Sequence, residues 1–126
     1  MAHQVQWTTN LQITGGPAFS LPGTMSVDAY DHVELLVKKG SKSAALQLPG
    51  AAGQLQLVLI SSDTFDNLTY TTSAQGATAT ELDATQFFAG KGAVGLLGAA
   101  PVSLTFDNSK GSQDANVEIL VGRSTT

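Results

Sequence analysis

The sequence predicts an all-β protein, and three observations support this prediction. Short runs rich in β-branched, aromatic and other apolar residues recur along the chain, separated by clusters of Gly, Pro, Asn and Asp. No long segment has the 3.6-residue period of an amphipathic helix. Strands do not alternate with helical segments, which argues against a parallel sheet. We therefore expect one domain over residues 1–126, an antiparallel β-sandwich of about eight strands, for which a jelly roll is one eligible topology.

The first half of the chain contains the clearest strand. Its apolar and polar residues alternate over a full strand length and end at Gly15. Pro22-Gly23 is a turn signal. The gap at Gly40 is short enough for a hairpin, and the break after Pro49 is short enough for a second antiparallel return. The strands expected here are residues 4–14, 24–28, 32–39, 43–48 and 54–61.

The second half is less regular in its middle. Residues 81–88 are long enough for one or two helical turns, and four glycines then space out a loop. The apolar residues of 87–100 are expected to cap an open end of the sandwich, and the alternative is a loop that inserts into a partner or a membrane. The strands expected here are residues 68–72, 77–80, 102–106 and 115–122.

Three of the expected strands are apolar on both faces, namely residues 33–37, 55–60 and 117–121. A strand with one solvated face would alternate between apolar and polar residues. The residues assigned to the core are Val33, Leu35, Val37, Leu55, Leu57, Leu59, Val117, Ile119 and Val121. The apolar residues assigned to the opposite face, and predicted as an interface between copies, are Leu36, Val58, Ile60 and Leu120. If the strands belong to different sheets, this patch dissolves.

Composition excludes several classes of function. Only 13% of the residues are charged, and the formal net charge is -4. The six Lys and Arg residues are scattered, so there is no basic stripe for nucleic acid. The chain has no Cys, which excludes disulfides and a Cys nucleophile. Neither a secretory signal nor a membrane-spanning segment is evident, so we expect cytoplasmic synthesis, with incorporation into an exported or particle assembly left open.

Two motifs suggest chemistry only weakly. Residues 90–95 match the G-x-G-x-x-G pattern, but the residues that follow cannot form the helix that a dinucleotide site needs. Asp28, Tyr30, His32 and Glu34 share one face if the segment is extended. A His between carboxylates could act as a base or a metal ligand, yet a solvated strand face explains the same pattern. We expect neither an enzyme nor a bound cofactor.

Two loops carry hard oxygen donors of the kind that calcium prefers. Their spacing does not match an EF-hand, and Asx residues also form turns. The only Trp, Trp7, is expected on a buried face, so no exposed aromatic platform for a glycan is evident. The candidate calcium or ligand residues are Asp63, Asp66, Asn67, Asp107, Asn108 and Asp114.

The combination of low charge, abundant Thr, Ser and Gln, and no Cys is similar in character to the building blocks of virus and phage particles, although no specific motif is shared. Weak self-repulsion favours dense packing of copies. The sequence therefore predicts a non-enzymatic structural protein that acts by homo-oligomeric self-assembly. The alternative is a small binding module for a glycan or small ligand, assisted by calcium.

Overall fold

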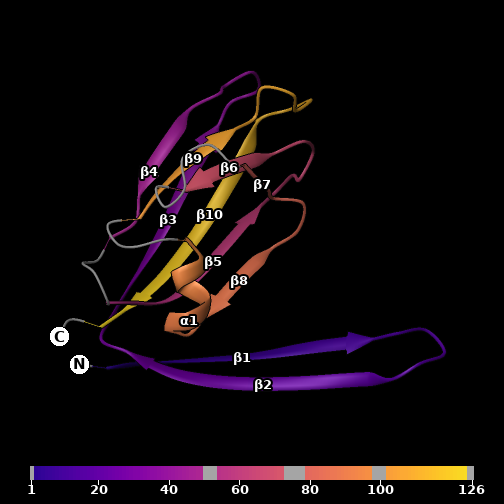
Figure 1. Ribbon diagram of the computed structural model, residues 1–126, viewed down its shortest axis with the longest axis vertical. Helices are drawn as coiled ribbons and strands as arrows, with labels where there is room; N and C mark the ends of the chain where they lie inside the picture. The colour runs from indigo at the N-terminus through magenta and orange to yellow at the C-terminus, as the bar shows by residue number, and fades with distance from the viewer. Residues whose placement is uncertain (1, 50–53, 73–78, 98–101, 125–126) are drawn as a thin grey trace.

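The computed structural model describes residues 2–49, 54–72, 79–97 and 102–124 (Figure 1). Strands dominate these residues, and their pairing is antiparallel, so the all-β prediction is confirmed. Within the described part, the elements are β1 (His3–Gln12), β2 (Ala18–Val27), β3 (Ala29–Val37), β4 (Ala44–Gln47), β5 (Leu55–Ser62), β6 (Thr69–Thr72), β7 (Thr80–Glu81), β8 (Gln86–Ala89), α1 (Lys91–Val94), the 3-10 helix η1 (Gly95–Leu97), β9 (Ser103–Asp107) and β10 (Ala115–Arg123).

Eight of these strands form two four-stranded sheets, one in the order β3-β10-β5-β8 and the other in the order β4-β9-β6-β7. Their antiparallel pairs are nested. The innermost pair is β6 with β7, followed outward by β5 with β8, β4 with β9, and β3 with β10. The later strands therefore pair with the earlier strands in reverse order along the chain. The remaining strands, β1 and β2, form a two-stranded sheet of their own.

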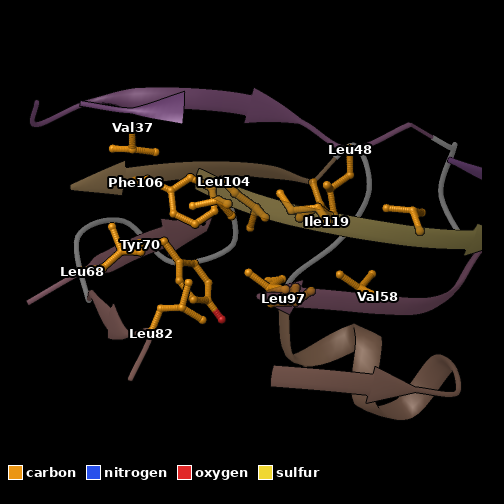
Figure 2. Close-up of a cluster of buried hydrophobic side chains, with 14 of the residues drawn as sticks. Val37, Leu48, Val58, Leu68, Tyr70, Leu82, Leu97, Leu104, Phe106 and Ile119 are labelled. Carbon is orange, nitrogen blue, oxygen red and sulfur yellow. The ribbon is translucent and has the colours of Figure 1, made fainter. Parts of the chain in front are cut away.

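The hydrophobic core contains side chains from both four-stranded sheets (Figure 2). Ile60 and Ile119 come from the first sheet, and they are directly opposite each other on β5 and β10. Tyr70 and Phe106 come from the second sheet and pack with ring centroids 5.7 Å apart. Burial of these large apolar side chains is the main source of the stability of the fold.

The two predicted hairpins are wrong. β3 and β4 lie in different sheets, and so do β4 and β5. The chain crosses between sheets at Gly40, whose φ of 87° favours glycine. The Gly40 N–H donates to the Asn108 carbonyl oxygen at 3.1 Å, and the Asn108 N–H donates to the Ser41 carbonyl oxygen at 2.8 Å. This crossing allows the strand before it to pair with β10 and the strand after it to pair with β9.

The predicted phase of β5 is wrong after its first residue; Leu55, beyond a register shift between β5 and β10, is in the core as predicted. Val58 and Ile60 are fully buried in the core, so they do not lie on an outer face. Leu57 and Leu59 take the opposite side, where Leu59 pairs with Leu120 of β10. Both phases of this strand are apolar, so periodicity could not choose between them. The assignments of Val33, Leu35 and Val37, and of Val117, Ile119 and Val121, to the core side agree with the burial pattern of β3 and β10.

Residues 81–88 do not form the expected helical turns. They include the end of β7 and most of β8, which pairs with β5. The short helix α1 begins at Lys91 instead, inside the glycine-rich motif, and is too short to present a helix N-terminus to a ligand. Residues 77–78, 98–100 and 50–53, which other predictions involve, lie outside the described residues.

Candidate functional site

β1 and β2 form a long hairpin, residues 3–27, which we term the N-terminal arm. The register is continuous from His3 opposite Val27 to Gln12 opposite Ala18, so the two side chains of each pair lie on the same face of the ribbon. One face is apolar and the other is polar, because side chains alternate along each strand. The apolar face carries His3, Val5, Trp7, Thr9, Leu11, Phe19, Leu21, Gly23, Met25 and Val27. The polar face carries Gln4, Gln6, Thr8, Asn10, Gln12, Ala18, Ser20, Pro22, Thr24 and Ser26.

The turn of the arm lies at Gly15-Gly16-Pro17. Gly15 has a φ of 76°, a conformation that costs glycine little. The Gly16 N–H donates to the Ile13 carbonyl oxygen at 2.7 Å, and the Ile13 N–H donates to the Pro17 carbonyl oxygen at 3.1 Å. Backbone hydrogen bonding therefore continues beyond the ends of β1 and β2 into the tip.

Pro22-Gly23 is not the predicted turn, because both residues lie within β2. Pro22 faces the polar side opposite Thr8 in a two-stranded ribbon that tolerates a missing N–H. Gly23 lies opposite Trp7, and a Cβ at this position would collide with the indole ring. The indole covers the glycine backbone, an arrangement that stabilises glycine within strands.

The base of the arm crosses the outer face of the β3-β10-β5-β8 sheet. The His3 ring meets the Tyr30 ring of β3 with centroids 5.0 Å apart. The Trp7 ring meets the Phe87 ring of β8 with centroids 5.2 Å apart. Four residues of strand advance by about 14 Å, close to the width of the four-stranded sheet at about 4.8 Å per step. The arm therefore reaches from β3 to β8, the two edge strands of this sheet.

The covering of this face is incomplete. Leu57 and Val27 are buried there, but a hollow of about 570 Å³ remains between the arm and the sheet, with Val5, Leu57 and Leu120 in its lining. The two-faced strands are thus explained in part by the protein itself. The apolar band on the outer side of β5 and β10 is where the arm is seated.

Beyond its contact with β8 the arm continues past the two four-stranded sheets (Figure 1). Its apolar face is exposed there, since Leu11, Ile13, Phe19 and Leu21 have exposed fractions of 55%, 59%, 51% and 53%. We term these four residues the tip patch. The sequence has no Asp, Glu, Lys or Arg before Asp28, so the whole arm is uncharged. Natural edge strands usually carry charges that prevent association, and this arm has none.

A second hollow lies beside the point where the arm leaves β8. A hollow of about 600 Å³ opens next to β8, with Phe87, Phe88, Leu96 and Leu97 in its lining. We term it the β8 hollow. Leu96 is the most exposed large apolar residue of the described chain, at 78%. Tyr70 also lines the hollow and donates a hydrogen bond from its hydroxyl to Gln86 Oε1 at 2.6 Å, while burial raises the pKa of this phenol.

The structure separates the four predicted interface residues. Val58 and Ile60 are in the core. Leu120 faces outward and lines the hollow under the arm, and Leu36 is 48% exposed at the far end of β3. The predicted patch therefore does not exist as one surface. The tip patch was missed, although an uncharged stretch from residue 1 to residue 27 was a visible signal.

The two candidate calcium loops do contact each other, but their carboxylates already accept hydrogen bonds. Asp66 Oδ2 accepts hydrogen bonds from the backbone N–H and the hydroxyl of Ser112, at 3.1 and 2.5 Å. These bonds lower the pKa of the Asp66 carboxyl. Asp63 accepts from the Asn116 N–H at 2.9 Å, and Asp114 accepts from the Lys39 N–H at 2.8 Å. Each carboxylate therefore joins two segments that are distant in the sequence.

The neighbouring Asp107 and Asn108 have similar structural roles. Asp107 accepts from the backbone N–H of Ser109 at 2.8 Å, and hydrogen bonding by Ser109 lowers the pKa of this carboxyl. Asn108 is buried and donates from Nδ2 to the carbonyl oxygens of Val37 and Gln113. Its Oδ1 has no hydrogen-bond partner among the described residues and packs against Gly111. Asn67, which has a φ of 52°, donates to Asp66 and to the Lys110 carbonyl oxygen.

The predicted acidic face of β3 is only partly formed. Tyr30, His32 and Glu34 share the outer face, while Asp28 precedes the strand and accepts a hydrogen bond from Ser124. Glu118 of β10 lies directly opposite Glu34. Donor atoms of His32, Glu34 and Glu118 come within 4.8 Å of one another, and all three side chains are exposed. One imidazole and two carboxylates could coordinate a divalent cation, but exposed charged strand faces commonly have this composition.

The site features thus define an amphipathic, uncharged arm with an exposed tip patch and an adjoining apolar hollow. No family model, curated protein or solved structure matches this chain. Among the described residues, neither short helix has the length and apolar character needed to cross a membrane.

Proposed function

We propose that this chain is a non-enzymatic structural protein that self-associates through its N-terminal arm. The observation that carries the proposal is the tip patch: four large apolar side chains half exposed on one face of an uncharged ribbon. An isolated two-stranded hairpin is marginally stable in water. Covering the tip patch would stabilise the ribbon that presents it.

The architecture is compatible with this role. The nested pairing of β3 to β10 is the one expected of a jelly roll, which viral capsid and lectin domains both use. The likeness therefore supports either assembly or ligand binding. The low charge of the chain favours assembly, because copies repel one another weakly.

The experiment is the oligomeric mass of three proteins, measured by light scattering behind a sizing column. In the test variant, Leu11→Ser is combined with Phe19→Ser, which are paired on the apolar face. In the control variant, Asn10→Ala is combined with Ser20→Ala, which are paired on the polar face. Each buried Leu or Phe contributes about 1.5–3 kcal/mol, so the test variant should associate at least about a hundredfold more weakly. Equal masses for the test variant and the wild type would contradict the proposal.

The second candidate is a binding module for a glycan or small ligand, assisted by calcium. The convergence of the loops that contain Asp63, Asp66 and Asp107 favours it. Calcium would have to compete with the hydrogen bonds that these carboxylates already accept from backbone N–H groups. A rise in thermal stability with calcium or with a glycan would support this candidate, and no shift with either would count against it.

A further inference from the structure

The direction of the arm places the tip patch out of reach of its own sandwich. Trp7 lies over Phe87, on the edge strand β8. The five residues from Thr8 to Gln12 extend about 17 Å beyond that point. The ribbon remains paired over this length and runs away from the two four-stranded sheets (Figure 1). The tip patch is therefore left half exposed in a single copy.

The β8 hollow is the apolar surface that continues from the base of the arm. Phe87 takes part in both features, because it contacts Trp7 and also lines the hollow. Leu96 projects beside it. Each molecule therefore presents one apolar projection and, beside it, one recess whose lining combines the apolar residues above with Thr72, Thr80 and Gln86.

We infer, building on the proposed self-association, that two copies pair about a twofold axis with their arms face to face and antiparallel, and that each tip enters the β8 hollow of the other copy. A twofold arrangement uses the projection and the recess of both copies and closes the assembly. The arms carry no charge, so their approach has no like-charge repulsion to overcome.

The contact area explains why the hollow is needed. A half-exposed Leu, Ile or Phe offers on the order of 100 Å². The tip patches of two facing arms then bury on the order of 800 Å², whereas stable specific interfaces usually bury more than about 1,200 Å². Seating each tip against Leu96 and Phe87 adds the missing apolar area from residues that are exposed in one copy.

Cross-linking tests this geometry. Because the chain has no native Cys, only the introduced cysteines can form a disulfide. An Ile13→Cys protein is mixed with an affinity-tagged Leu96→Cys protein under mild oxidation, and the tagged cross-linked dimer is quantified. The matched control replaces Ile13→Cys with Gln12→Cys, on the opposite face of the same ribbon. A disulfide requires Cα atoms within about 7 Å, so we expect at least a fivefold higher yield for the Ile13 pair.

A second variant, Leu96→Asp, makes the test independent of any change in the arm. Leu96 is exposed, so the substitution should leave the fold intact, which circular dichroism verifies. We expect it to lower the dimer fraction at least tenfold. If the wild type is oligomeric but the two cross-linking yields are equal and Leu96→Asp associates normally, the twofold geometry is wrong and the proposed function stands. If the wild type is monomeric, both are wrong.

Discussion

The indole of Trp7 meets the ring of Phe87 edge to face, with the ring planes at 76° to each other. This contact fixes where the arm leaves the β3-β10-β5-β8 sheet. It joins the half of the arm that covers the sheet to the half that is exposed. The predicted path of the arm, and therefore the position of the tip patch, depends on it.

Removal of the Phe87 ring should loosen the arm. Phe87→Ala is expected to lower the free energy of unfolding by about 1–2 kcal/mol, through the lost aromatic pair and its packing. Trp7 is the only Trp, so its fluorescence should shift to longer wavelength as water reaches the indole. The control is Leu36→Ala. Leu36 is exposed on the same face of the sheet but lies near the C-terminal end of β3, away from Trp7, so this substitution should leave the emission unchanged. An unchanged emission for Phe87→Ala would refute the contact.

A methyl group at residue 111 should be strongly destabilising. The Cβ of Gly111→Ala would collide with Oδ1 of the buried Asn108, which is held by its two Nδ2 hydrogen bonds. We expect a loss of about 2–4 kcal/mol in chemical denaturation. The control is Gly92→Ala in α1, where a Cβ would meet nothing within 4 Å. That substitution should be neutral or stabilise by up to about 1 kcal/mol.

The Glu34 and Glu118 pair should be unfavourable, because like charges directly opposite each other on a sheet repel. Glu118→Gln is expected to raise the free energy of unfolding by about 0.2–1 kcal/mol at neutral pH. The gain should shrink as salt is added, since both side chains are exposed. Urea denaturation at low and high ionic strength measures this, and a gain that does not change with salt would exclude repulsion as the cause.

Because Ser112 donates hydrogen bonds to the Asp66 carboxylate, the free energy of unfolding should fall when this carboxyl is protonated in acid. Its pKa is lowered in the folded state by the hydroxyl and then the backbone N–H of Ser112. A lowered folded pKa means that its stabilisation is present above the unfolded pKa, near pH 4, and is lost as the pH falls through the folded pKa. Ser112→Ala removes the hydroxyl donor, so the Asp66 pKa should rise toward its ordinary value. An NMR titration measures it, and an unchanged pKa would rule out this hydrogen bond.

Alternation and turn residues were sufficient to predict much of the fold. β5, β6, β9 and β10 lie within one residue of the predicted strands, and the period-two pattern of β1 is correct. These segments have strong local patterns that the tertiary structure does not override. The pairing of strands was not predictable, because Gly40 reads equally well as a hairpin turn or as a crossing between sheets.

The candidate site was harder to predict than the fold. The phase of Val58 and Ile60 depends on the register between β5 and β10, which local sequence does not encode. Pro22-Gly23 has the composition of a turn, and only the indole of Trp7 across the ribbon explains its place within a strand. The predicted two-faced apolar strands did indicate a covered surface. The sequence could not indicate that the cover is formed by residues 3–27 of the same chain.

The mass of the wild-type protein in solution, followed over a dilution series, tests self-association through the arm most directly. The chain has a mass of 13.0 kDa. We predict a species of at least twice this mass that dissociates on dilution, and whose association is weakened at least about a hundredfold by combining Leu11→Ser with Phe19→Ser. A monomer at every concentration, or an oligomer that this double variant leaves intact, would contradict the proposal.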